Sequence, residues 1–117
     1  MLNVLKAFQS IIKTYVVELF ERETNRKRLK ATITFIDGSR LFIKDYNFGS
    51  ERKYSYHWAD RYGELIIRWD NAPHWRQITT FPHHKHIGSS ERVEPSLEID
   101  LSAVLLFIKS QISQISD

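Results

Sequence analysis

Residues 54–70 read YSYHWADRYGELIIRWD, and this stretch decides the fold class. Apolar and polar side chains alternate on both sides of the turn sequence Asp60–Gly63, which is typical of two half-buried strands joined as a hairpin. The apolar positions share one face: Tyr54, Tyr56, Trp58, Leu65, Ile67 and Trp69. A turn centred on Arg61-Tyr62 predicts the pairs Trp58–Leu65, Tyr56–Ile67 and Tyr54–Trp69. We expect this aromatic face to pack against helices.

The opposite face of the same hairpin is polar. It carries Ser55, His57, Arg68 and Asp70. Because alternate residues of a strand point to opposite faces, this polar face is free to form a site while the aromatic face forms the core. Tyr56 belongs to the core face and is therefore not expected in the site.

Two further elements precede this hairpin. Residues 29–35 alternate, the turn signal Asp37-Gly38-Ser39 follows, and residues 41–43 are apolar, which predicts a first hairpin. Before it, apolar residues recur at helical spacing from Val4 to Leu19. This spacing predicts an amphipathic helix of about five turns, capped by Asn3 and ending near Thr24-Asn25.

The periodicity stops after Asp70. Residues 71–88 contain Pro73 and Pro82 and show no helical pattern, so they are expected to form a long loop of the kind that is usually functional. A C-terminal helix is predicted from Leu101 onward, with Asp100 as its N-cap and with five apolar positions in register: Leu101, Val104, Leu105, Ile108 and Ile112.

These elements predict one α+β domain over residues 1–117. We expect a twisted four-stranded antiparallel sheet, made of two hairpins, with the N- and C-terminal helices packed on one face. A chain of 117 residues with 42% hydrophobic residues is long enough to bury a core.

Composition excludes several classes of protein. The chain has no cysteine, which excludes disulfides, thiolate zinc sites and a cysteine nucleophile. It has no run of eighteen apolar residues, and charged residues interrupt its N-terminal segment, so neither a membrane span nor a signal peptide is expected. We therefore expect a cytoplasmic protein that makes no use of a membrane.

The charge is unevenly distributed. Residues 1–90 carry 15 basic and 9 acidic side chains, whereas residues 91–117 carry 2 basic and 5 acidic ones. The densest basic cluster contains Arg26, Lys27, Arg28 and Lys30. Such a cluster attracts phosphates through charge and counterion release, although a solvated end of a helix has the same composition.

Histidines mark the place where we expect chemistry. His74, His83, His84 and His86 lie within thirteen residues, and His57 lies on the polar hairpin face. Histidine both takes and gives protons near neutrality. Cleavage of RNA through its 2′-hydroxyl needs a base, an acid and a cation for the charge on phosphorus, and these residues supply all three without a metal.

Each candidate residue has an expected role in that reaction. The proton-transfer and orienting candidates are Asp70, His57, His74, His83, His84 and His86. The expected RNA-binding residues are Arg68 and Lys85 for the phosphate, Trp75 for stacking on a base, and Arg26, Lys27 and Arg28 for steering.

Two alternatives stay open. Asp70 and His74, together with His83, His84 or His86, offer oxygen and nitrogen ligands to a divalent metal, although the spacing matches no specific zinc signature and Lys85 would lie beside the ion. A non-catalytic module that binds nucleic acid or a partner protein would use the same loop. Histidines of a proline-rich loop also satisfy backbone groups in purely structural roles.

The strings YSYHW (54–58), RWDNAPHW (68–75) and TFPHHKH (80–86), followed by VLLFI (104–108), resemble the TumE family of toxin–antitoxin proteins. The resemblance covers roughly Leu29 to Ile108. Family members often carry a second histidine after DNAPH, where this chain has Trp75. The resemblance implies a cytoplasmic toxin whose partner is a cognate antitoxin with a helix-turn-helix domain. RNA is then the expected target, by analogy with other small toxins, and a homodimer is left open.

Overall fold

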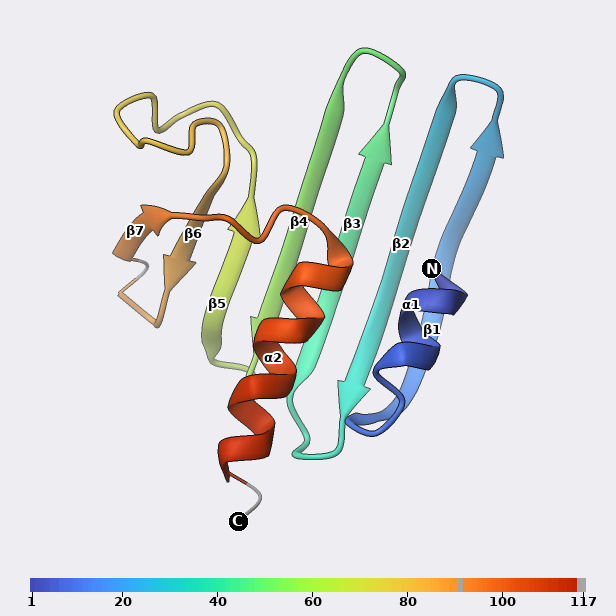
Figure 1. Ribbon diagram of the computed structural model, residues 1–117, viewed down its shortest axis with the longest axis vertical. Coiled ribbons are helices and arrows are strands. Elements are labelled where there is room, and N and C mark those ends of the chain that lie inside the picture. The colour runs from blue at the N-terminus through green and yellow to red at the C-terminus, as the bar shows by residue number, and fades with distance from the viewer. Residues whose placement is uncertain (91, 116–117) are drawn as a thin grey trace.

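The computed structural model describes residues 1–90 and 92–115, which form seven strands and two helices (Figure 1). The elements are α1 (Leu2–Ala7), β1 (Ile12–Glu23), β2 (Arg26–Phe35), β3 (Arg40–Asn47), β4 (Arg52–Ala59), β5 (Leu65–Asp70), β6 (His84–Ile87), β7 (Arg92–Pro95) and α2 (Leu101–Ile115). Each strand pairs antiparallel with the next one along the chain, giving one sheet in the order β1 to β7. The fold is α+β as expected, but the prediction of a four-stranded sheet is wrong.

The central hairpin confirms the predicted faces and corrects the predicted register. Tyr56 pairs with Trp69 and Trp58 pairs with Ile67, with an irregularity between Trp58 and Ala59. The pairing differs from the predicted one by two residues. Because side chains alternate with a period of two, this shift leaves the same residues on the core face. Tyr56 and Trp69 are fully buried there.

The first hairpin is present as predicted, formed by β2 and β3. Its turn is fixed by Asp37, whose Oδ1 accepts a hydrogen bond from the Ser39 N–H at 2.9 Å. Gly38 lies between them with φ of 87°, a left-handed conformation that glycine adopts without strain.

The N-terminal prediction is wrong beyond Ala7. The helix α1 ends there, its N-cap residue is Met1 rather than Asn3, and residues 12–23 form β1 against β2. The segment from Thr14 to Phe20 is rich in β-branched and aromatic residues, which favour a strand. Pairing with β2 also satisfies the backbone groups that β2 would otherwise expose.

The predicted loop is shorter than expected because its last part is a strand. The strand β6 begins at His84 and pairs with β5, and β7 follows it as the last strand of the sheet. Histidines and a lysine obscured the strand pattern, because alternation normally shows as apolar against polar residues. The connection from β5 to β6 therefore covers residues 71–83.

Both described helices lie on the same face of the sheet (Figure 1). Asp100 caps α2 as predicted, since its Oδ1 accepts a hydrogen bond from the Ala103 N–H at 2.8 Å. The five apolar positions predicted for this helix are all buried in the core: Leu101, Val104, Leu105, Ile108 and Ile112. They pack with the aromatic residues of β4 and β5, and Leu5, Phe8 and Ile11 join the same core from the N-terminal segment.

Residues on the other face form rows that cross the strands. One row runs through Lys30, Lys44, Ser55, Asp70 and His84, and the next runs through Thr32, Phe42, His57, Arg68 and His86. No helix among the described residues covers this face (Figure 1). Five of the predicted site residues therefore lie on the sheet surface opposite the core: His57, Arg68, Asp70, His84 and His86.

Candidate active site

The end of β5 and the start of β6 bring a carboxylate beside two histidines. Asp70 is the last residue of β5, and it lies opposite His84, the first residue of β6. Two positions further along the ladder, Arg68 lies opposite His86. Because every second side chain of a strand shares a face, all four point away from the face that Trp69 shares with the helices.

Asp70 is the centre of this group. Its Oδ1 lies 2.9 Å from Nε2 of His84, and its Oδ2 lies 3.5 Å from Nε2 of His86. The same Oδ2 lies 3.5 Å from Nε of Arg68. One carboxylate is therefore shared by three groups that can each carry a positive charge. We call Asp70, His84 and His86 the Asp70 cluster.

The Asp70 cluster is sheltered from solvent. His84 is 1% exposed and His86 is 8% exposed. The indole of Trp75, from the 71–83 connection, lies with its ring centroid 6.3 Å from each imidazole. Nδ1 of His84 lies 3.0 Å from the carbonyl oxygen of Pro82 and must donate there, because a carbonyl only accepts. His84 is thus fixed at both nitrogens.

The same three side chains have the geometry of a metal site. Asp70, His84 and His86 each offer one ligand atom, and these atoms lie within 4.8 Å of one another. Two imidazoles and one carboxylate suit zinc or another transition ion. The contact from His84 Nδ1 to Pro82 is the kind of outer contact that orients a metal-binding imidazole.

The neighbouring strand extends the polar group. Ser55 lies opposite Asp70, and His57 lies opposite Arg68. Arg68 is therefore flanked in one row by His57 on β4 and His86 on β6. Adjacent strands are about 4.8 Å apart, so the backbones of the two histidines are about 10 Å apart with the arginine between them.

Lys85 does not join the Asp70 cluster. It lies on the opposite face of β6, where its Nζ is 3.4 Å from Oε1 of Glu98 and 5.9 Å from the ring centroid of Phe107. The alternation of a strand separates it from its two histidine neighbours. The structure therefore places Lys85, predicted to hold the phosphate, away from the histidines predicted to transfer protons.

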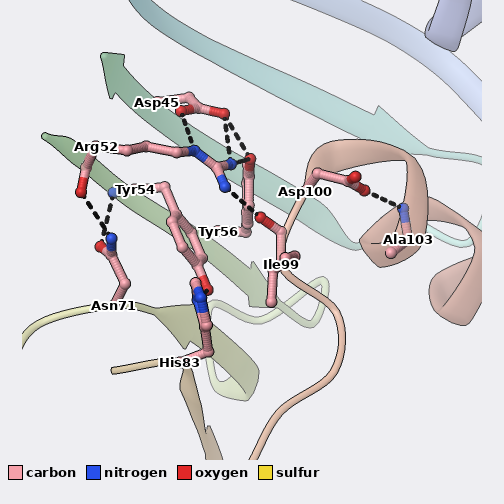
Figure 2. Close-up of polar contacts among 9 residues, drawn as sticks. All are labelled: Asp45, Arg52, Tyr54, Tyr56, Asn71, His83, Ile99, Asp100 and Ala103. Carbon is pink, nitrogen blue, oxygen red and sulfur yellow. Dashed lines mark hydrogen bonds and ion pairs between the residues drawn. The ribbon is translucent and has the colours of Figure 1, made fainter. Parts of the chain in front are cut away.

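His83 belongs to a different group, on the helix side of the sheet (Figure 2). Its Nδ1 lies 2.8 Å from the hydroxyl of Tyr54, and the two rings stack at 5.8 Å. Burial, together with the nearby Arg52 and His84, lowers the pKa of His83 below its ordinary value. The lowered pKa favours the neutral form of this imidazole, which shares a hydrogen bond with the Tyr54 hydroxyl.

Arg52 organises this second group (Figure 2). Its Nε and Nη2 each lie 3.0 Å from an oxygen of Asp45, in a two-pronged contact, and its Nη1 donates to the carbonyl of Ile99 at 2.6 Å. Burial works to lower the pKa of Arg52, but the hydrogen bonds to Asp45 and the electrostatic attraction to Tyr56, Asp45 and Tyr54 together raise it. Burial raises the pKa of Tyr56, whose hydroxyl donates to Asp45 at 2.7 Å. The network ties the start of α2 to β3 and β4.

Asp45 and Arg52 are absent from the residues predicted for the site. A signal for them exists in the sequence, because two opposite charges flank the turn sequence Asn47–Ser50 between two strand patterns. Arg52 is engaged with Asp45, Tyr56 and Ile99, so we assign the network a structural role.

Two predicted groups lie outside the Asp70 cluster. His74 is exposed and lines a groove of about 540 Å³, together with Lys53 and Phe81. The basic residues Arg26, Lys27 and Arg28 begin β2, at the same end of the sheet as Asp70 but three strands away (Figure 1). Arg28 donates from Nε to Oε2 of Glu21 at 3.0 Å, which raises its pKa.

These features describe a small α+β protein with a polar histidine-rich site on an open sheet face. A family model described as Toxin TumE matches residues 1–112. The match covers nearly the whole chain, so the chain belongs to the TumE toxin family, as the sequence resemblance indicated. No curated protein and no solved structure gave a significant match. None of the described helices is long and apolar enough to cross a membrane.

Proposed function

We propose that this toxin cleaves RNA by metal-independent acid–base chemistry at Arg68 and the Asp70 cluster. The observation that supports the proposal is the row His57–Arg68–His86, in which a guanidinium-bearing residue lies between two histidines, with Asp70 beside His86. Displacement at a phosphodiester needs a base on one side of phosphorus and an acid on the other.

In the proposed step, Arg68 holds the scissile phosphate and stabilises its added negative charge. His86 takes the proton of the 2′-hydroxyl, and the 2′-oxygen forms its bond to phosphorus. The bond from phosphorus to the 5′-oxygen breaks, and His57 donates a proton to that oxygen. The products are a 2′,3′-cyclic phosphate and a 5′-hydroxyl.

The remaining residues position these groups. Asp70 orients His86 and stabilises its protonated form, since its Oδ2 lies 3.5 Å from Nε2. His84 holds the other carboxylate oxygen at 2.9 Å and is itself anchored to Pro82. Trp75 covers both imidazoles and offers a surface on which a base can stack.

The test is to incubate purified protein with total RNA in EDTA. We expect cleavage by the wild-type chain and its loss in His86→Asn and His57→Asn. Tyr62→Asn serves as a control, because Tyr62 is 83% exposed in the β4–β5 turn, at the other end of β5 from Asp70. Full activity in both histidine variants would refute the assignment.

A second candidate is a metal-dependent nuclease at the same place, favoured by the ligand atoms of Asp70, His84 and His86 within 4.8 Å. A bound divalent ion would supply a Lewis acid or an activated water. Cleavage that is absent in EDTA and restored by added Mn²⁺ or Zn²⁺ would select this candidate. Intact RNA with saturable binding under both conditions would instead indicate a non-catalytic module.

We further propose that the toxin acts in the cytoplasm and is neutralised there by a cognate helix-turn-helix antitoxin. The family match supports the toxin role on which this pairing depends. Co-expression with the neighbouring reading frame should yield a complex that no longer cleaves RNA. Separate purification of the two chains would contradict the pairing.

A further inference from the structure

We infer that the open sheet face over β2, β3 and β4 binds single-stranded RNA that continues from the scissile phosphate. The inference rests on the proposed function for its substrate. It assigns binding roles to Lys30, Lys44 and Phe42, which are not part of the Asp70 cluster, and we call these three residues the open-face track.

The track is continuous with the Asp70 cluster. Lys30 pairs with Lys44, Lys44 pairs with Ser55, and Ser55 pairs with Asp70, so all four share one face and one row. With about 4.8 Å between strands, Lys44 lies about 10 Å and Lys30 about 14 Å from Asp70 along the row. Both lysines are exposed. The positive charges of Lys30 and Lys44 therefore lie in one row with Asp70, next to the proposed position of the scissile phosphate.

An aromatic ring lies in the adjoining row. Phe42 is 43% exposed, and its ring meets that of His57 edge to face at 5.9 Å. It lies opposite His57 in the ladder, which places it next to the proposed acid. An exposed aromatic ring on a sheet beside lysines is a typical platform for an unpaired base.

The surface here is slightly hollowed. A depression of about 120 Å³ is lined by Lys30, Thr32, Phe42, Lys44, Ser55 and His57. Glu18 lies at its β1 side and accepts a hydrogen bond from the hydroxyl of Thr32 at 2.5 Å. At β5 and β6, Trp75 lies against the two imidazoles. The open-face track therefore lies between the Asp70 cluster on one side and Glu18 of β1 on the other.

Single-stranded RNA fits this surface better than a duplex or a protein. A ring lying on a sheet can stack only on a base that is not paired within a helix. Two lysines in one row with Asp70 match the continuous charge of a nucleic-acid backbone. An acidic protein partner would form ion pairs with the two lysines, but it has no nucleobase to stack on the ring of Phe42.

The experiment measures binding of a fluorescent 2′-O-methyl oligonucleotide, which lacks the reactive hydroxyl and stays intact. We expect Lys30→Ala/Lys44→Ala to weaken binding roughly tenfold and to lower the slope of log affinity against log salt by about 1.4. Phe42→Leu should weaken binding without changing that slope. Lys6→Ala, on α1 at the helix side of the sheet, is the matched control.

The outcomes separate this inference from the proposed function. Unchanged affinity in all three track substitutions, or a preference for duplex RNA, would overturn the inference even if the protein cleaves RNA. Weakened binding by the track variants would support it even if no RNA is ever cleaved. If the substitutions release the cognate antitoxin and leave RNA binding intact, the face binds protein and the inference is wrong.

Discussion

Oδ1 of Asp70 on β5 lies 2.9 Å from Nε2 of His84 on β6, although the two residues are separated by the 71–83 connection. The contact is a direct product of the ladder, which places Asp70 opposite His84 and Arg68 opposite His86. A carboxylate held between two sheltered imidazoles is costly unless the groups compensate each other. This mutual dependence gives the first prediction.

Asp70→Asn should both destabilise the protein and lower its proposed activity. The substitution removes the charge that compensates His84 and His86, so we expect a loss of about 1–3 kcal/mol in the free energy of unfolding. RNA cleavage should fall roughly 10²-fold because His86 loses its orienting partner. Chemical denaturation and a cleavage assay measure the two effects. A variant with wild-type stability would contradict the described contacts.

The pKa of His83 should be found below its ordinary value of about 6.5. A depressed pKa in the folded state means that the unfolded chain binds more protons, so the stabilising contribution of this group is lost as pH falls below about 6.5. NMR titration of the imidazole measures the pKa directly. His83→Gln should flatten this part of the dependence of stability on pH, and an unchanged profile would show that folding does not lower the pKa of His83.

Arg52→Ala should cost more stability than any exposed ion pair. Arg52 joins Asp45 to the backbone at Ile99, just before α2, so its loss should lower the free energy of unfolding by about 2 kcal/mol. Arg92 is the control, because its pair with Glu94 is exposed and its removal should cost less than about 0.5 kcal/mol. Equal effects in the two variants would show that the network does not hold α2 to the sheet.

The N-terminal strand makes a separate prediction about the fold. Val16 is 57% exposed on β1, so Val16→Lys should change stability by less than about 0.5 kcal/mol. Ile33 on β2 is fully buried, so Ile33→Ala should cost about 2–5 kcal/mol. Thermal unfolding compares the two. A large loss in Val16→Lys would instead favour an amphipathic helix packed through this residue.

Much of the fold could be predicted because short-range patterns agree with the final packing. The alternation from Tyr54 to Asp70 identifies the core face, and the cap at Asp100 locates the start of α2. The register differed by two residues for two reasons: Leu65 pairs with Ala59 and not with Trp58, and an irregularity between Trp58 and Ala59 adds a second residue to the shift. The prediction that the aromatic face of this hairpin packs against a helix was also confirmed.

The failures have a common physical cause. Apolar spacing between Val4 and Leu19 fits a helix, but the identities of the residues favour a strand, and β2 offered a partner. At β6 the residues on both faces of the strand are polar: His84 contacts Asp70, and Lys85 contacts Glu98 on the opposite face. The strand therefore lacks the apolar–polar alternation by which a strand is predicted from sequence. In both segments, contacts with residues distant in the sequence determine the secondary structure.

The structure brings together only part of the set of residues predicted for the site. Asp70, His84 and His86 do meet, with Arg68 beside them, because strand pairing brings them together. Lys85 and His83 lie on the helix side of the sheet, and His74 is exposed on the connection. Sequence spacing alone does not show which face of the sheet each neighbouring histidine lies on. That assignment requires the bounds of the strand that carries them.

The most direct test of the account is to identify the ends of RNA cleaved by purified protein in EDTA. The account predicts 2′,3′-cyclic phosphate and 5′-hydroxyl ends from the wild-type chain, with cleavage lost in His86→Asn while the variant stays folded. Intact RNA from the wild-type chain in EDTA, or undiminished cleavage by folded His86→Asn, would contradict it.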